Sequence, residues 1–452
     1  MESIVFLAIF IPVVVAMRST PGKAFLQVYL PALLLLPDTY HTTLQGIPKL
    51  SFNQAVAFGL FPLVLLRYVR RWRFTFNDFL VLALVGVIAT SEYQAAGYKE
   101  AQNLTIATVC SVLAPYLMAR LVIPAEQLYV ATARRYVWMV FIVSVVSLYE
   151  FRFGYDIFLE LWKPLFRGQG EGWVVTFRYG FARVAGPYAH AILAGVIAVS
   201  AYRLQRWLEW GGYWEPRFGG IGKGLPWPKA RVITSALLLF ALATLARGPW
   251  LGGLIGGVLV MIGRSHKRKA MMTQVLVVAC VVVPIAYTSF TAYLDVKPGE
   301  VMTQSQESAV YRKELMEKYT NIAEDKLPLG WGRNTWPKVP GMPSIDNYFL
   351  LLTLMHGAIA TSLFLGLFAW GIGRLFQAGM AEPVGTPSLS FAFAGIQIAA
   401  LVSLVTVYLG ENLMPALFLL FGWAESHLQV PYQQDGPAKA PTATGWRFRV
   451  LR

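Results

Sequence analysis

The sequence is poor in charge and in cysteine. Only 14% of its 452 residues are charged, against about 25% in a typical water-soluble domain, whereas 56% are hydrophobic and the mean hydropathy is +0.51. The scarcity of charge excludes a soluble globular enzyme and indicates a protein that lives in a bilayer. The two cysteines, Cys110 and Cys280, each lie in an apolar run with no ligand spacing around them, which argues against a disulfide framework and a cysteine metal site.

Several motifs of well-known enzyme classes are also missing. There is no Gly-rich phosphate loop, no His-Glu-x-x-His metal motif and no nucleophile elbow. The chain also lacks the repeated halves that would suggest a transporter, and the acidic spacing of a metal-dependent glycosyltransferase loop. The formal charge of +15 falls in short basic clusters between apolar runs, as in the cytoplasmic loops of multispanning proteins, so a nucleic-acid partner is not expected.

Long apolar runs are what the sequence has in abundance. Runs that cross or nearly cross a hydrocarbon core of about 30 Å are centred near residues 10, 31, 60, 86, 112, 141, 194, 239, 256, 281, 356, 400 and 419. They lack strand-like alternation, and only helices or closed barrels satisfy backbone polar groups in lipid. We therefore expect an all-α polytopic membrane protein of about 12–13 transmembrane helices, with one membrane domain over residues 1–431 and a basic cytoplasmic tail over 432–452.

The basic clusters predict which connections lie on which side of the membrane. Clusters within 67–73, 133–135, 203–207, 228–231 and 264–269, with the terminal WRFRVLR, indicate the cytoplasmic side. The connections near 150–184, 247–249 and 291–344 then lie outside. The first of these is rich in aromatic residues, from Phe151 through Trp173 to Phe181, and is either an interfacial belt or a surface that stacks on sugar rings.

The long outer connection 291–344 contains a predicted surface helix. Its sequence ESAVYRKELMEKYTNIAEDK places apolar side chains at helical spacing, namely Tyr311, Leu315, Tyr319 and Ile322. Arg312 lies beside this stripe, where the pattern alone favours a solvated helix face over an anion-binding role. Arg333 follows in the same connection and is a further candidate for substrate binding.

Arg247 separates the end of one apolar run from the Gly-Pro start of the next. A guanidinium there can hold a diphosphate through paired hydrogen bonds, or can simply extend to the interface. Arg178, Arg183 and His190 enter another span, and their spacing predicts Arg183 and His190 on one helical face, as a groove for anionic groups or an interfacial anchor.

Asp346 opens the apolar run that follows the long outer connection. An ionisable residue at this depth is costly without a partner or a task, and the alternatives are a catalytic carboxylate or a helix N-cap. His356 lies ten residues further along, about 15 Å deeper on a helix, and we expect it to pack or hydrogen-bond inside the membrane.

Together these segments resemble the O-antigen ligase and O-antigen polymerase superfamily of bacterial membrane glycosyltransferases. The resemblance rests on GPYAHAILAG (186–195), ARGPWLGGLIGG (246–257), SAVYRKEL (308–315), LPLGWG (327–332) and DNYFLLLTLMHGAIA (346–360). It implies a helical membrane fold of the GT-C type. It also implies transfer of glycans from a polyprenyl diphosphate carrier to an acceptor hydroxyl at the outer face of the bacterial inner membrane, with no cofactor, nucleotide sugar or required metal.

The resemblance further implies roles for individual residues. Arg247 and Arg312 would bind the carrier diphosphate, Asp346 would activate the acceptor, and Asn347 would help to orient it. A single carboxylate favours direct displacement with inversion. The expected partners are the lipid-linked oligosaccharide, a glycan acceptor, the bilayer and a chain-length regulator.

The pair Asp346-Asn347 stands where family ligases that act on lipopolysaccharide core usually have His-Asn. This difference favours a polymerase of exopolysaccharide or O-antigen repeat units, with a ligase as the alternative. A transporter or flippase of lipid-linked glycans is a third hypothesis, which predicts charged sites near the bilayer midplane.

Overall fold

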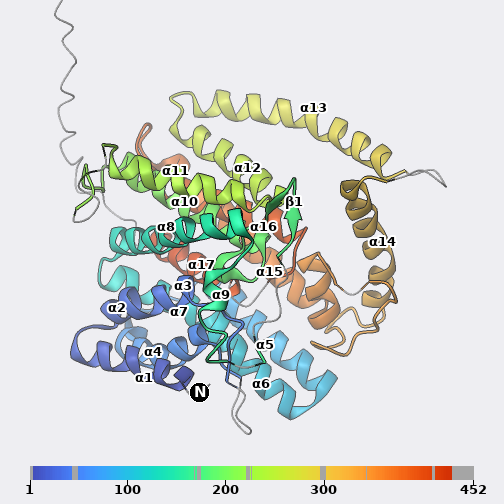
Figure 1. Ribbon diagram of the computed structural model, residues 1–452, viewed down its shortest axis with the longest axis horizontal. Helices are drawn as coiled ribbons and strands as arrows, with labels where there is room; N and C mark the ends of the chain where they lie inside the picture. The colour runs from blue at the N-terminus through green and yellow to red at the C-terminus, as the bar shows by residue number, and fades with distance from the viewer. Residues whose placement is uncertain are drawn as a thin grey trace, which may run out of the picture.

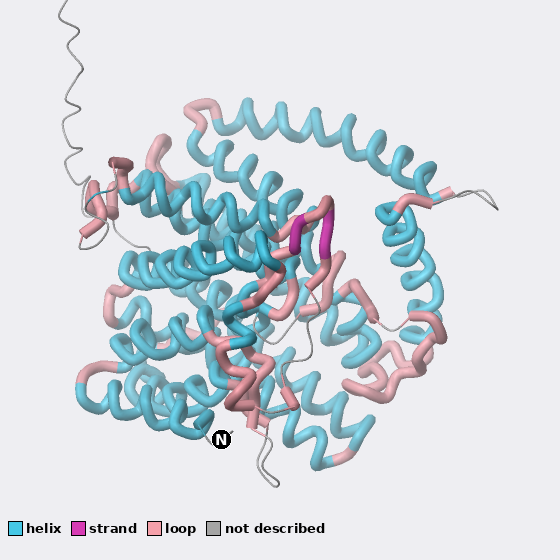
Figure 2. The backbone as a smooth tube through the Cα atoms, viewed as in Figure 1, coloured by secondary structure: helices cyan, strands magenta, loops and turns pink. Residues whose placement is uncertain are grey.

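The computed structural model describes residues 4–42, 49–166, 168–169, 175–219, 224, 226–295, 302–342, 344–409 and 413–429. The expected tail 432–452 lies outside these residues, and so does Trp173 of the aromatic connection. Helices make up nearly all the regular structure of the described part (Figure 2).

The α-helices are α1 (Ile4–Arg18), α2 (Pro21–Ala24), α3 (Leu30–Leu35), α4 (Phe52–Tyr68), α5 (Phe76–Ala96), α6 (Tyr98–Thr108), α7 (Ala114–Ala125), α8 (Tyr129–Phe153), α9 (Ile157–Glu160), α10 (Ala191–Trp210), α11 (Lys229–Ala243), α12 (Arg247–Arg264), α13 (Arg268–Leu294), α14 (Gln304–Glu324), α15 (Tyr348–Ala381), α16 (Leu389–Leu404) and α17 (Leu413–Gln429). Two π-helical segments, η1 (Phe25–Tyr29) and η3 (Val109–Leu113), join α2 to α3 and α6 to α7; η2 (Val69–Arg71) and η4 (Gly186–Tyr188) are 3₁₀ turns. The strands are β1 (Phe177–Arg178) and β2 (Phe181–Ala182).

Each of the thirteen predicted apolar centres lies in a helix. Six helical stretches of the described chain are long and apolar enough to cross a membrane: 52–71, 76–96, 98–125, 129–153, 268–294 and 348–381. The helices α1 and α16 are apolar but shorter. The prediction of an all-α polytopic membrane protein is therefore confirmed.

Most of the long helices run side by side in one bundle, and pairs that are distant in sequence pack together (Figure 1). The glycines of α12 explain one such pair. A Cβ on Gly252 would lie 2.7 Å from the Cα of Ala399, and one on Gly256 would lie 2.4 Å from the carbonyl oxygen of Gly395. Small residues thus let α12 and α16 approach closely, as is common in membrane helices.

The helix α13 lies apart from the bundle and arches over it toward α14 (Figure 1). None of its apolar window is buried within the described structure. A helix that is apolar all round and unburied suits contact with lipid. The surface helix predicted in the long outer connection is α14: Leu315 and Tyr319 are 1% exposed and pack toward α15, and Lys318 Nζ lies 3.3 Å from Glu314 on the outer face.

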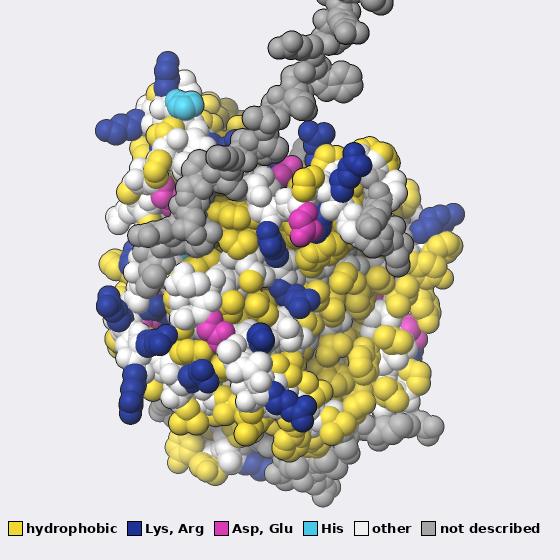
Figure 3. All heavy atoms as spheres, turned by 90° about the vertical axis from the view of Figure 1, so that its left-hand side faces the viewer, with side chains coloured by type: hydrophobic (Ala, Val, Ile, Leu, Met, Phe, Trp, Pro, Cys, Tyr) yellow, Lys and Arg dark blue, Asp and Glu magenta, His cyan; other side chains and the backbone are white. Residues whose placement is uncertain are grey.

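Basic residues mark one end of the bundle. The last residues of α1 and α12 and the first turns of α8 and α11 lie together at the left of Figure 1, and they carry Arg18, Arg264, Arg134 and Lys229. Figure 3 shows Lys and Arg side chains spread over this face among apolar ones. Arg247 begins α12 and Arg264 ends it, so these two arginines lie about 25 Å apart along the helix.

The helix α15 is interrupted at Gly357, whose φ is 79°. The segment LPLGWG (327–332) fills the interruption: the N–H groups of Trp331 and Gly332 donate to the carbonyls of Leu354 and Met355, and the N–H of Ala358 donates to the carbonyl of Leu327. Two of the segments that carry the family resemblance are therefore in direct contact.

Candidate functional site

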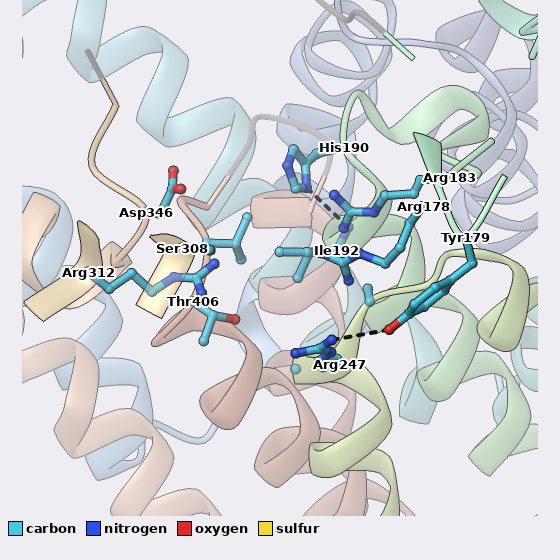
Figure 4. A pocket seen from close by; sticks show the side chains of 13 residues that line it. Arg178, Tyr179, Arg183, His190, Ile192, Arg247, Ser308, Arg312, Asp346 and Thr406 are labelled. Atoms are coloured by element: carbon cyan, nitrogen blue, oxygen red, sulfur yellow. Dashed lines mark hydrogen bonds between the residues drawn. The ribbon is translucent and has the colours of Figure 1, made fainter. Parts of the chain in front are cut away.

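A group of charged side chains away from the basic end lines a cavity of about 320 Å³, here called the arginine cavity. Six of the eight candidate residues from the sequence line it: Arg178, Arg183, His190, Arg247, Arg312 and Asp346. They come from the β-hairpin, the entry to α10, the start of α12, the helix α14 and the entry to α15. In Figure 4, Asp346 and Arg312 lie on one side of the cavity and Arg178 and Arg183 on the other, with Arg247 below them.

A two-residue β-turn places Arg178 at the cavity. Strands β1 and β2 pair antiparallel, and the turn residues Tyr179 and Gly180 have φ of 55° and 80°, the signs of a type I′ turn. The guanidinium of Arg178 donates from Nη1 to the carbonyl of Leu245 at 2.7 Å. This bond joins the hairpin to the loop that leads into α12.

Arg183 and His190 do not share a helical face, so that prediction was wrong. Arg183 lies in the loop after β2, and His190 is the N-cap of α10, with η4 between them. The chain cannot be helical through Gly186, whose φ is 55° and whose N–H donates to the buried Glu150. Both side chains nevertheless reach the arginine cavity, by a turn rather than by helical periodicity.

Arg247 is exposed and occupies the first position of α12, where its Nη2 donates to the hydroxyl of Tyr179 at 3.2 Å. The close packing of α12 on α16 fixes this helix end and brings Thr406, just after α16, to the cavity wall. A Cβ on Gly248 would lie 2.8 Å from Thr406 Oγ1. The family segment at 246–257 thus positions one arginine through its glycines.

Arg312 faces the cavity from α14. Its Nε is buried and has no hydrogen-bond partner within the described structure. The helix is tied to the entry of α15 by Tyr311, whose hydroxyl donates to the carbonyl of Ser344 at 2.8 Å. A buried guanidinium N–H without an acceptor is costly, and an anionic ligand in the cavity would satisfy it.

Asn347, not Asp346, caps α15. Its Oδ1 accepts hydrogen bonds from the N–H groups of Phe349 and Leu350 at 3.0 and 3.3 Å. Asp346 is left half-buried at the cavity wall, where its Oδ1 accepts from Ser344 Oγ at 3.1 Å. Because Asn347 is the N-cap of α15, Asp346 does not cap this helix. Asn347 itself does not line the cavity.

The electrostatics of the cavity favour binding of an anion. Burial, with the charges of Arg178 and Arg312, lowers the pKa of Arg183 to about 10. Burial, with the charges of Arg247 and Arg312, lowers the pKa of Arg178. Burial, with the charge of Arg183, lowers the pKa of His190 to about 4. The four guanidinium groups repel one another, and only one carboxylate among the described lining residues opposes them.

His190 is thus neutral near pH 7. Its Nδ1 accepts a hydrogen bond from the N–H of Ile192 at 3.1 Å. The helices α10, α12 and α15 all begin at this cavity, and their positive ends add to the field that favours an anion.

Backbone strain also gathers here. Four non-glycine residues of the described chain have positive φ, and three of them adjoin the cavity: Tyr179 at 55°, Ala189 at 58° and Leu245 at 48°. Such conformations cost about 1–3 kcal/mol each and cluster at functional sites. They precede or follow Arg178, His190 and Arg247, so the strain accompanies the positioning of these side chains.

Arg333 lies elsewhere. It lines a mainly apolar cavity of about 300 Å³ together with His356 and Tyr348. The walls of the two cavities touch at one point, because the ring centre of Tyr408, which lines the apolar cavity, lies 6.2 Å from that of His190. His356 is buried, and its Nδ1 lies 3.2 Å from Ser91 Oγ, as expected of a hydrogen-bonding residue inside the membrane.

Sequence reasoning missed Tyr179, Ser308 and Thr406 as cavity residues. A Tyr-Gly turn between Phe-Arg and Phe-Ala was a usable signal for the first, and Ser308 lies one turn before Arg312 on α14. Nothing in the sequence near Thr406 indicates a site, because only the packing of α16 on α12 brings it there. Among the described residues, no three His, Cys, Asp or Glu side chains lie close enough to hold a metal ion.

The lining residues of the arginine cavity can carry out two chemical tasks. Four arginines can neutralise a diphosphate through paired hydrogen bonds, and one carboxylate can take a proton from a hydroxyl. The cavity is therefore suited to departure of a diphosphate leaving group.

Comparison with known proteins identifies one family match. Residues 232–365 match the family model of the O-antigen ligase, which confirms the resemblance to the superfamily. The match covers less than a third of the chain; it includes Arg247, Arg312 and Asp346 but not the hairpin. No curated protein matches. A chain from a solved structure described as "Structural coordination of polymerization and crosslinking by a peptidoglycan synthase complex" is similar at 17% identity and a TM-score of 0.42, covering 79% of this chain and 98% of that chain.

Proposed function

We propose, from the premise that residues 232–365 form an O-antigen ligase domain, that this multi-pass membrane protein polymerises polyprenyl diphosphate-linked oligosaccharide repeat units. The product would be an exopolysaccharide or an O-antigen. The observation that carries the proposal is the arginine cavity, where Arg247 and Arg312 meet Asp346 from three separate helical segments.

The proposed reaction is a single displacement. The carrier diphosphate lies among the guanidinium groups, with Arg247 and Arg312 as its principal ligands and Arg178 and Arg183 beside them. The acceptor hydroxyl gives its proton to Asp346 while its oxygen bonds to the anomeric carbon, and the bond from that carbon to the diphosphate oxygen breaks. The diphosphate leaves with both electrons of that bond, stabilised by the arginines. Inversion follows, because no second carboxylate lines the described cavity to act as nucleophile.

The acceptor would approach through the adjoining apolar cavity. Arg333 and Tyr348 line that cavity, and Asp346 lies two residues before Tyr348 at the entry of α15. A lipid-linked acceptor needs both an apolar channel and a cation, which this cavity supplies.

The proposal also assigns a side of the membrane. The basic end of the bundle would face the cytoplasm, and the arginine cavity would face the periplasm of a bacterial inner membrane. The first and last residues of α12 support this, since Arg247 lines the cavity and Arg264 lies at the basic end.

Reconstitution of the purified chain with a polyprenyl diphosphate-linked oligosaccharide tests the function. Without nucleotide sugars, we expect a ladder of products at the spacing of one repeat unit. A single transfer that requires a lipid A–core acceptor would replace the polymerase with a ligase. Movement of the lipid-linked glycan between leaflets without a new glycosidic bond would replace both with a transporter.

A further inference from the structure

A second charged cavity lies at the basic end of the bundle and takes no part in the proposed reaction. Its volume is about 360 Å³, and we call it the Lys229 cavity. It lies between α2 with η1, the first turns of α8, and the start of α11. Its lining residues are Lys23, Leu26, Gln27, Ala131, Arg134, Arg135, Trp138, Trp214, Glu215 and Lys229.

Two of its four cations already have protein partners. Lys229 is 8% exposed, its Nζ lies 3.0 Å from Glu215, and it lies 5.3 Å and 5.1 Å from the ring centres of Trp138 and Trp214. Arg134 donates to the carbonyl of Tyr213 and lies 5.9 Å from the ring of Trp214. These contacts hold a cationic, aromatic wall in place.

The other two cations, Lys23 and Arg135, have no such partners in the described part of the chain. In the described structure no acceptor contacts the side chain of Lys23 or Arg135, and Glu215 is the sole carboxylate that lines the cavity. Lys23 is exposed and Arg135 is half-buried. The cavity therefore carries a net positive charge that an anion with several oxygens would offset.

The depth of the cavity indicates where that anion comes from. Arg134 and Arg135 lie in the first two turns of α8, one of the helices long and apolar enough to span a membrane. The cavity therefore opens at the level where a spanning helix leaves the hydrocarbon, and Trp138 and Leu26 give it an apolar floor. A free inorganic anion would leave the apolar floor without contacts, whereas a lipid would contact the cations with its headgroup and the floor with its acyl chain.

We propose that the Lys229 cavity binds the phosphodiester headgroup of an anionic membrane lipid. Its phosphate is bound by Lys23 and Arg135, and its upper acyl carbons lie against the apolar floor. Basic pockets between membrane helices on the cytoplasmic side commonly recognise such headgroups. The bound lipid bridges α2, α8 and α11, which all contribute residues to the cavity wall.

Binding of a short-chain phosphatidylglycerol to the purified full-length chain in neutral detergent tests the proposal. Dissociation constants are compared with those for short-chain phosphatidylcholine and for inorganic phosphate. The test variant is Lys23→Ala/Arg135→Gln, and the matched control is Arg231→Gln/Lys269→Gln, which removes two exposed cations outside the cavity. We expect tighter binding of phosphatidylglycerol than of either comparison ligand, weakened about 10-fold or more in the test variant and unchanged in the control.

Three results would overturn the proposal. Equal affinity for the two lipids would show that the headgroup is not recognised. Inorganic phosphate that binds as tightly as phosphatidylglycerol would show a site for free anions, and equal weakening in both double variants would show an effect of overall charge. Should the test variant fail to fold, a photo-crosslinking amino acid at Gln27 tests the site in the otherwise native chain. We expect phosphatidylglycerol to cross-link there more than at the exposed Leu66 of α4. Equal labelling at the two positions would contradict the site.

Discussion

At the scale of single residues, the proposed binding of a diphosphate depends on geometry that lysine cannot supply. Arg312 has an unpartnered buried Nε, and Arg247 lies at the first position of a helix. Lysine keeps the charge but loses the paired hydrogen bonds to a diphosphate. We expect Arg247→Lys or Arg312→Lys to lower turnover about 100-fold, measured as product formed per minute in proteoliposomes. The exposed Arg231→Lys is the control, and unchanged turnover in the cavity variants would remove the diphosphate role.

Titration of Arg183 predicts how anion binding depends on pH. Its pKa is lowered to about 10, so it is charged below that pH, and a bound diphosphate raises the pKa again. The contribution of Arg183 to the affinity is therefore fully present below about pH 9 and is lost as the pH rises through about 10. Calorimetric titration with farnesyl diphosphate from pH 7.5, where the probe itself no longer titrates, measures this.

The variant Arg183→Gln provides the control for that titration. It should bind the probe more weakly than the native chain below about pH 9 and should lack the fall near pH 10. His190, with its pKa lowered to about 4, adds no further step in this range. Affinity that already declines between pH 7.5 and 9 in the native chain would contradict the assignment.

At the scale of elements, the interruption of α15 holds the LPLGWG segment against the helix. Gly357 has φ of 79°, and a Cβ there would lie 2.3 Å from the carbonyl oxygen of Pro328. We expect Gly357→Ala to lower the free energy of unfolding by about 1–3 kcal/mol, seen as a lower melting temperature in detergent. The matched control is Gly373→Ala in the same helix, where a Cβ meets nothing within 4 Å; equal melting temperatures for the two variants would contradict the account.

The helices and their connections also show which parts of the structure could be predicted from the sequence. Apolar length predicted the helices, because a membrane helix must satisfy its own backbone over a fixed span. The entry to α10 was mispredicted as helical from Arg183 to His190. What breaks the helix there is a tertiary contact, since buried Glu150 accepts the N–H groups of Ala185 and Gly186 from 35 and 36 residues away. Likewise, Thr406 reaches the cavity through the packing of α16 on α12. The sequence around Thr406 contains no pattern that predicts this packing.

At the scale of the whole molecule, the proposed orientation separates the two charged ends of the bundle. Glu317 is exposed on α14, and Lys269 is exposed at the basic end. In a chain whose two cysteines are replaced by serine, a membrane-impermeant maleimide should label Glu317→Cys in intact cells and Lys269→Cys only after permeabilisation. The reverse pattern would place the arginine cavity on the cytoplasmic side.

We propose that Asp346 removes the proton of the acceptor in a cavity that binds a diphosphate. The measurement that tests it most directly is the turnover of Asp346→Asn in proteoliposomes with lipid-linked oligosaccharide, beside the exposed Asp325→Asn as control. We predict that Asp346→Asn loses about 100-fold or more of its turnover while donor affinity and folding are retained, and that the control is unaffected. Native turnover in Asp346→Asn would contradict the account, because the carboxylate would then not act as the base.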